Sequence, residues 1–240
     1  MIMLQAKNLT IGYETNKRLI ESINFDCTAG ELIILLGVNG IGKSTLLKTL
    51  CGLLDPISGT ITYEERNIFT TPPNERAKII SGVFTSRDFD PYISVREFIT
   101  LGRYPYTNWL GSLTGSDEAM IDQALRTLGL MHLADKKVHQ ISDGERQKTL
   151  IAKALAQDTP VIIMDEPTAF LDYKNKAELL DTIRKLASEQ NKIIIVSTHD
   201  ISSSLPYSDK AFLISESGKF VHVKSDRYSE RELKAVMETQ

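Results

Sequence analysis

The chain of 240 residues lacks several features that would tie it to an oxidising compartment or to a membrane. Its only cysteines, Cys27 and Cys51, are too few and too isolated for a disulfide framework or a zinc site, and we interpret both as core residues of a protein in a reducing compartment. No apolar run approaches the roughly 20 residues that span a bilayer. The first residues also lack the basic and apolar regions of a secretion signal, so we expect neither export nor membrane insertion.

An excess of charge of one sign is also missing. The 28 basic and 31 acidic residues give a formal net charge of −3, so no global basic field predicts a nucleic-acid partner. Internal repeats and low-complexity segments are absent from the sequence as well. The length fits one large α/β domain over residues 1–240, with room for a small inserted subdomain but not for a second independent domain.

The most informative feature that is present is a phosphate-binding loop. Residues 37–45 read GVNGIGKST, which satisfies G-x-x-x-x-G-K-[ST], and they follow an apolar run at 31–36 that predicts a buried strand. Lys43 can reach the β- and γ-phosphates of a nucleotide, the Ser44 hydroxyl suits Mg²⁺, and the glycines let backbone N–H groups wrap a phosphate. A chance glycine-rich turn is the alternative, which the flanking strand and helix disfavour.

Two adjacent acids form the second strong motif. Residues 161–166 read VIIMDE, an apolar strand that ends in Asp165 and Glu166. Because the carboxyl ends of parallel strands lie at one edge of a sheet, we expect both acids beside the phosphate loop. There Asp165 can hold Mg²⁺ and Glu166 can polarise a water molecule. By itself an Asp-Glu pair after a strand is more often a solvated turn, and the phosphate loop is what favours the functional interpretation.

The apolar pattern predicts an α/β fold around these motifs. Alternating apolar residues predict antiparallel strands at 3–10 and 19–25 and further short strands at 59–63 and 77–83. From about 88 to 158 the periodicity becomes helical, which indicates an inserted helical subdomain.

Further along the chain, continuous apolar runs at 160–164 and 192–197 predict central parallel strands that are covered on both faces. A crossover helix between them has one apolar face, and Ser229 has capping-box spacing to Glu232 for a short terminal helix. We therefore predict a phosphate-loop NTPase with a parallel core sheet, an antiparallel β subdomain and an inserted helical subdomain. The residues expected on the apolar face of the crossover helix are Ala177, Leu180, Ile183 and Leu186.

Three further motifs point to one family. The sequence ISDGERQ at 141–147 precedes a predicted helix, Asp172 follows the acidic pair, and STHD at 197–200 follows the next central strand. In the order of these motifs the chain resembles ATP-binding-cassette ATPases over nearly its whole length. The resemblance implies hydrolysis of ATP with Mg²⁺, a signature motif at 142–145, a D-loop acid at Asp172 and a switch histidine at His199. Taken singly, the Ser142 turn could be an ordinary helix N-cap and a lone histidine after a strand is usually structural.

The resemblance also implies partners. It implies a head-to-tail homodimer in which each ATP lies between the phosphate loop of one copy and the Ser142 and Gly144 turn of the other. It also implies that Tyr13 stacks on adenine. An ordinary tyrosine at the end of a strand is the alternative for Tyr13. The candidate catalytic residues are Lys43, Glu166 and His199, and the candidate metal ligands are Ser44, Thr85 and Asp165. The candidate nucleotide-binding residues are Tyr13, Gly37, Asn39, Gly40, Gly42, Lys43, Ser44, Thr45, Ser142, Gly144, Glu145 and Asp172.

The sequence departs from the family pattern at two places. The family normally has a glutamine after the strand that leaves the core, but this chain has none between Gln5 and Gln123, and Thr85 occupies the expected position. Its hydroxyl has a shorter reach toward a metal than an amide. The signature motif has Asp143 and Glu145 where Gly and Gln are commonest. Since Lys43, Ser142, Gly144 and Glu166 are retained, we expect an active ATPase.

A segment in the helical insertion resembles one group of importers within the family. Residues 101–106 read LGRYPY and resemble a G-R-x-P-[YH] segment of ATPases from ferric-siderophore, haem and cobalamin importers. This implies a peripheral subunit on the cytoplasmic face of the inner membrane, bound to permease subunits and linked indirectly to a substrate-binding protein. A proline-broken helix end is the ordinary alternative for the segment. The alternative functions are an exporter or lipoprotein-release ATPase, a soluble cassette protein acting on nucleic acid or ribosomes, and a largely non-hydrolytic nucleotide-binding module.

Overall fold

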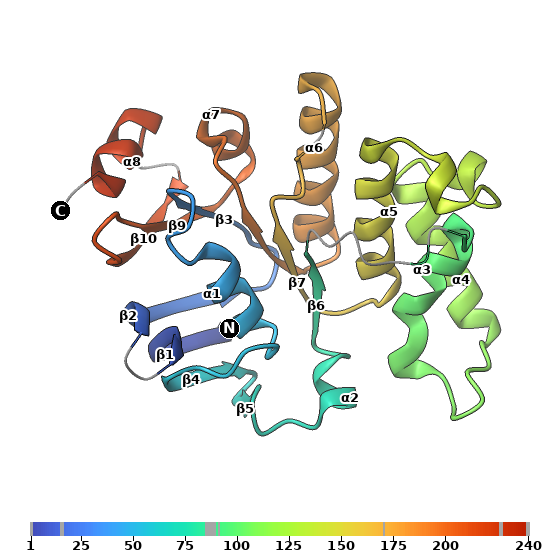
Figure 1. The fold of residues 1–240 in the computed structure, drawn as a ribbon, viewed down its shortest axis with the longest axis horizontal. Coiled ribbons are helices and arrows are strands. Elements are labelled where there is room, and N and C mark those ends of the chain that lie inside the picture. The colour runs from blue at the N-terminus through green and yellow to red at the C-terminus, as the bar shows by residue number, and fades with distance from the viewer. Residues whose placement is uncertain are drawn as a thin grey trace.

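The computed structural model describes residues 2–14, 17–84, 90, 92–169, 171–225 and 228–238. Within them, the chain forms two sheets and a set of helices (Figure 1). The strands are β1 (Ile2–Glu14), β2 (Lys17–Thr28), β3 (Leu32–Gly37), β4 (Ser58–Tyr63), β5 (Arg66–Asn67), β6 (Ile80–Val83), β7 (Val161–Asp165), β8 (Ile193–Ser197), β9 (Lys210–Ile214) and β10 (Phe220–Lys224).

Helices pack against the central sheet, and those between β6 and β7 form one end of the molecule (Figure 1). The α-helices are α1 (Lys43–Leu50), α2 (Pro73–Arg76), α3 (Val95–Thr100), α4 (Gly115–Thr127), α5 (Asp143–Ala156), α6 (Tyr173–Glu189), α7 (Ile201–Ser204) and α8 (Glu230–Met237). Short 3₁₀ helices are η1 (Leu101–Tyr106), η2 (Met131–Leu133), η3 (Val138–Gln140) and η4 (Leu205–Tyr207).

A mostly parallel sheet lies at the centre of the fold. Its described strands have the order β10-β9-β3-β8-β7-β6, and all neighbours pair in parallel except β10 with β9. The register places Ser197 of β8 opposite both Leu35 of β3 and Asp165 of β7. The carboxyl ends of β3, β7 and β8 therefore meet at one edge of the sheet, as the sequence predicted.

The central strands are apolar along their whole length because both faces of the sheet are covered. Ile163 and Ile195 belong to the core shared with α1 and the antiparallel sheet. Their neighbours Ile162 and Ile194 belong to the core shared with α4, α5 and α6. All four side chains are fully buried, which accounts for the absence of polar alternation in β7 and β8.

The second sheet is antiparallel and has the order β2-β1-β4-β5 among its described strands. β1 and β2 pair along most of their length, with Ala6 opposite Phe25. The predicted strands at 3–10 and 19–25 are thus confirmed as parts of longer strands. Cys27 and Cys51 are buried, as the sequence predicted. Together the two sheets and the helices form the predicted phosphate-loop α/β fold.

Side-chain caps start most of the longer helices. Ser94, Thr114, Ser142 and Ser229 each form a reciprocal capping box at the first turn of α3, α4, α5 and α8. The terminal helix that Ser229 predicted is therefore confirmed.

The crossover helix α6 was predicted only approximately. Ala177 is partly exposed, whereas Leu179 and Ala187 face the core with the other predicted residues. The true apolar face is rotated from the predicted one because Leu179 and Leu180 are both buried.

The helices between β6 and β7 pack together at one end of the molecule (Figure 1). Their division from the core as a subdomain at about 88–158 stays a prediction. No helix in the described part of the chain is both long and apolar enough to cross a lipid bilayer.

Within these helices the segment at 101–106 has a buried side and an exposed side. Arg103 is buried and forms an ion pair with Asp117, with an N···O distance of 2.9 Å. It also donates a hydrogen bond of 2.7 Å to the Ala156 carbonyl, and its guanidinium lies 4.0 Å from the centre of the Tyr106 ring. Tyr104 is 63% exposed. Arg103 therefore joins η1 to α4 and to the end of α5, and Tyr104 is left at the surface.

The buried Arg103 ion pair yields a stability prediction. Removal of one partner, as in Asp117→Ala, leaves a buried guanidinium without its counter-charge, which should lower the free energy of unfolding by about 3–5 kcal/mol. The control is Asp181→Ala, which breaks the exposed pair of Lys185 and Asp181 on α6 and should cost less than about 1 kcal/mol. Urea unfolding of both variants measures the difference, and equal small losses would contradict the assignment.

Candidate functional site

The phosphate loop joins the end of β3 to the start of α1. Gly37 is the last residue of β3, and Gly42 is the N-cap of α1. Gly40 and Gly42 have φ angles of 80° and 115°, in a region that residues with a Cβ atom rarely adopt. The glycines thus allow the turn that brings the loop to the first turn of α1, where unpaired N–H groups and the helix dipole favour an anion.

Lys43 lies between this loop and the acidic edge of the sheet. Its Nζ atom donates hydrogen bonds of 2.7 Å to the Gly37 carbonyl and 3.2 Å to the Val38 carbonyl. Burial lowers the pKa of Lys43, while the nearby carboxylates of Glu166 and Asp165 act in the opposite direction. The lysine can exchange its carbonyl partners for phosphate oxygens without leaving the loop.

The two acids are fixed by a serine on the neighbouring strand. The Ser197 hydroxyl donates a hydrogen bond of 2.6 Å to Asp165 Oδ1 and accepts one of 2.9 Å from the Glu166 backbone N–H. Glu166 has a φ angle of 50°, which is strained for a residue with a side chain. Sequence reasoning gave Ser197 no role, although its position at the end of β8, next to the acid-bearing strand, was the available signal.

His199 contacts the second acid. Its Nδ1 atom lies 2.8 Å from Glu166 Oε2, and because an ionised carboxylate can only accept, the imidazole N–H donates in this contact. The His199 side chain is mostly exposed, whereas the Glu166 side chain is mostly buried. This is the arrangement of a candidate general base with a second side chain that orients it.

Tyr13 and Thr45 connect the antiparallel sheet to the phosphate loop. The Tyr13 hydroxyl lies 3.3 Å from Thr45 Oγ1 in the first turn of α1, and the tyrosine side chain is 67% exposed. Asn39 and Ser44 are also exposed in this region. An exposed ring beside the phosphate loop can stack on a flat, aromatic ligand group.

The loop and the acidic edge also supply oxygen donors for a divalent cation. Ser44 provides a hydroxyl near the start of α1, and Asp165 provides a carboxylate at the end of β7. Hydroxyl and carboxylate oxygens fit Mg²⁺, which prefers hard oxygen ligands. Thr85, the third predicted ligand, lies outside the described residues, and its role stays a prediction.

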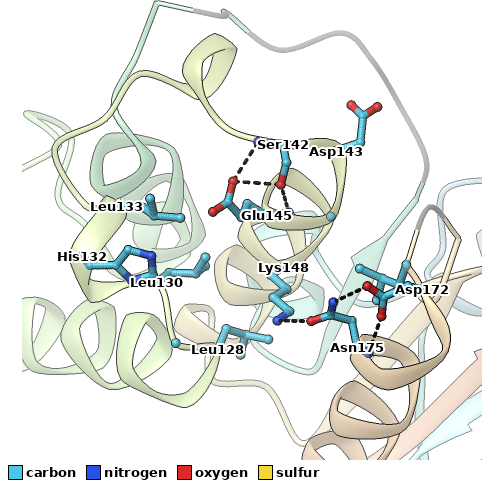
Figure 2. A pocket seen from close by; sticks show the side chains of 13 residues that line it. Leu128, Leu130, His132, Leu133, Ser142, Asp143, Glu145, Lys148, Asp172 and Asn175 are labelled. Atoms are coloured by element: carbon cyan, nitrogen blue, oxygen red, sulfur yellow. Dashed lines mark hydrogen bonds between the residues drawn. The ribbon is translucent and has the colours of Figure 1, made fainter.

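A second group of predicted residues lies at the N-terminal ends of α5 and α6. Ser142 is the N-cap of α5, and Asp172 is the N-cap of α6 and accepts a hydrogen bond of 2.8 Å from the Asn175 N–H. Ser142, Gly144, Glu145 and Asp172 line one cavity of about 480 Å³ (Figure 2). The fold therefore brings these four predicted residues to one place.

Glu145 is the least typical member of this second group. Its Oε2 atom accepts hydrogen bonds of 2.8 Å from both the backbone N–H and the hydroxyl of Ser142 (Figure 2). These hydrogen bonds lower the pKa of Glu145. The carboxylate is therefore ionised at neutral pH and lies at the positive end of α5.

The two groups of predicted residues are separate within one chain. The first contains the phosphate loop, Tyr13, Asp165, Glu166 and His199, and the second contains the Ser142 turn with Asp172. Across the described ranges, no hydrogen bond or ion pair joins a predicted residue of one group to one of the other.

Similarity to known proteins identifies the family. Residues 20–169 match the family model described as ABC transporter. The chain belongs to the ABC transporter family. An uncharacterised ABC transporter ATP-binding protein of Methanocaldococcus jannaschii is 42% identical over 88% of this chain and 73% of its own length. The achromobactin transport ATP-binding protein CbrD of Dickeya dadantii is 38% identical over 87% of this chain and 77% of its own length.

Solved structures of the family have the same fold. A chain of an inward-facing ABC transporter, assigned provisionally to the metal-chelate type, is 31% identical and covers 98% of this chain and 88% of its own, with a TM-score of 0.83. The ATP-binding cassette MJ0796 was solved as a dimer in a post-hydrolysis state with ADP and inorganic phosphate, and it is 25% identical, with a TM-score of 0.81, over 93% of this chain and 99% of its own. As a member of this family, the chain is an ATP-binding ATPase of a membrane transporter.

The two hydrogen bonds of Ser197 yield a kinetic prediction. Ser197→Ala removes both, which should lower ATP turnover about tenfold, since a hydrogen bond contributes about 1.5 kcal/mol. Affinity for ATP should change less, because the phosphate loop is untouched. The matched control is Ser204→Ala, which changes a buried serine of α7. Steady-state kinetics and nucleotide binding test both variants, and normal turnover of Ser197→Ala would contradict the positioning role.

Proposed function

We propose that the chain is the ATP-hydrolysing subunit of an importer for metal chelates, and that two copies bind ATP head to tail beneath a permease. The observation that carries the ATPase chemistry is the contact between His199 and Glu166 at the sheet edge where Lys43 lies. Glu166 provides a proton acceptor, His199 orients it, and Lys43 provides a cation for the phosphate.

In this proposal, hydrolysis begins when the loop at 37–45 binds the phosphates of ATP through its N–H groups and Lys43. Glu166 then accepts the proton of the attacking water, and His199 holds the carboxylate in place through its N–H. A Mg²⁺ ion held by Ser44 and Asp165 would supply positive charge to the phosphate oxygens. Tyr13 stacks on the adenine ring.

The second half of each ATP site comes from the other copy. The N-terminus of α5 has a serine hydroxyl, a glycine and a positive helix end, which together suit a phosphate. Among the residues that the structure describes, this turn shares no hydrogen bond with the phosphate loop, and the proposal assigns it to the ATP of the partner copy. Asp172 lines the same cavity and belongs to the same surface.

The cargo class follows from similarity to transporters of known type. Relatives include an achromobactin transport ATP-binding protein and a chain of a transporter of the metal-chelate type. We extend this class to the present chain, with iron siderophores, haem and cobalamin as its members. The ATPase would lie on the cytoplasmic face of the membrane, and a separate binding protein would deliver the chelate to the permease.

The Glu166 carboxylate provides the test of this function. Glu166→Gln keeps the side-chain shape but cannot accept the proton, so ATP should still bind while turnover falls about 10²–10⁴-fold. The variant should accumulate as an ATP-bound dimer, and cells that carry it should lose uptake of labelled iron chelate or cobalamin.

The matched control is Glu189→Gln at the far end of α6, which should keep normal turnover and uptake. Near-normal turnover of Glu166→Gln in the assembled transporter would contradict the base assignment. Loss of turnover with unchanged chelate uptake would contradict the cargo class alone.

A further inference from the structure

The first turn of α5 has an unusual charge for a surface that is proposed to bind phosphate. Asp143 and Glu145 place two carboxylates beside Ser142 and Gly144. Asp143 forms an ion pair of 2.7 Å with Arg146 in the next turn of the helix. Glu145 instead turns back to Ser142, so the two acids of this turn have different roles.

The Glu145 carboxylate occupies the hydrogen-bond donors that a phosphate would need. Its Oε2 atom lies 2.8 Å from the Ser142 backbone nitrogen and 2.8 Å from the Ser142 hydroxyl. The same hydroxyl accepts a hydrogen bond of 3.3 Å from the Glu145 backbone N–H, which completes the capping box. A phosphate oxygen would use these donors and the same positive helix end. The Glu145 carboxylate therefore occupies the position that a phosphate of ATP would take.

The surroundings allow the carboxylate to leave. Ser142 is exposed, and both residues line the cavity that opens in front of the turn (Figure 2). Lys136 and His132 lie close enough to favour the charged form of Glu145. A carboxylate that is displaced from Ser142 thus has the Lys136 ammonium and the His132 imidazole nearby.

We propose that Glu145 is a latch on the Ser142 turn, which the phosphate of ATP on a second copy must displace before the dimer closes. This inference rests on the proposed function. Glu145 acts through Ser142 and is a positioning residue. The latch raises the ATP concentration at which two copies associate and leaves the chemical step at Glu166 unchanged.

The test variant removes the charge of Glu145 and keeps the hydrogen bonds that cap α5. In Glu145→Gln the amide oxygen can accept the same hydrogen bonds from Ser142, but the negative charge is gone. In a Glu166→Gln background, sedimentation should show dimers at an ATP concentration about three- to tenfold lower than without the second change. The difference should shrink in about 0.5 M NaCl, because salt weakens the charge-assisted contact between Glu145 and the Ser142 donors. In the otherwise unchanged protein, KM for ATP should fall by a similar factor.

The matched control is Asp143→Asn, which removes the same charge from the same turn without touching the hydrogen bonds of Ser142. It should shift the ATP requirement by less than about twofold. An equal shift in both variants would show that general charge repulsion, and not the Glu145 latch, sets the ATP requirement, which would overturn the inference. An unchanged or higher ATP requirement in Glu145→Gln would also overturn it. Ser142→Arg separates the two proposals: if ATP still drives dimer formation in that variant, the proposed phosphate surface itself is wrong, whatever Glu145 does.

Discussion

The parallel pairing of β3, β7 and β8 is the constraint on which the candidate site depends. It brings the phosphate loop, the two acids and the strand that precedes His199 to one edge of the sheet, although they are far apart in sequence. Register matters as much as direction, because it places Ser197 opposite Asp165 and within hydrogen-bond distance of the Glu166 backbone. A shift of one residue would turn these side chains to the other face of the sheet.

A second constraint is local and acts at helix ends. The same capping chemistry that starts α5 also fixes the Ser142 hydroxyl and backbone N–H, which donate to Glu145, so one turn serves both folding and, in our proposal, nucleotide binding. Ser142 is therefore an N-cap, which was the ordinary structural alternative for this motif. An N-cap can also serve as a phosphate-binding surface, so the two interpretations are compatible. The same carboxylate that stabilises the cap would compete with phosphate.

Much of the fold could be predicted because its signals are local. The apolar runs of β7 and β8, the glycines of the phosphate loop and the capping residue Ser229 each act within a few residues. The roles of Ser197 and Arg103 could not be predicted in this way, because each depends on a partner from a distant strand or helix. Sequence spacing likewise gave only an approximate apolar face for α6, since the position of the sheet decides which of its residues are buried.

The central claim is that each ATP site is completed by a second copy of the chain, and mixed dimers test it most directly. One chain carries Lys43→Ala and the other Ser142→Arg, with different tags, so one composite site has both lesions and the other is intact at both motifs. The measurement is ATP-dependent association of the two tagged chains. Our account predicts that they associate with each other in ATP while neither associates with itself. Failure of the mixed pair to associate, under conditions in which the unmodified chain forms dimers, would contradict the shared site.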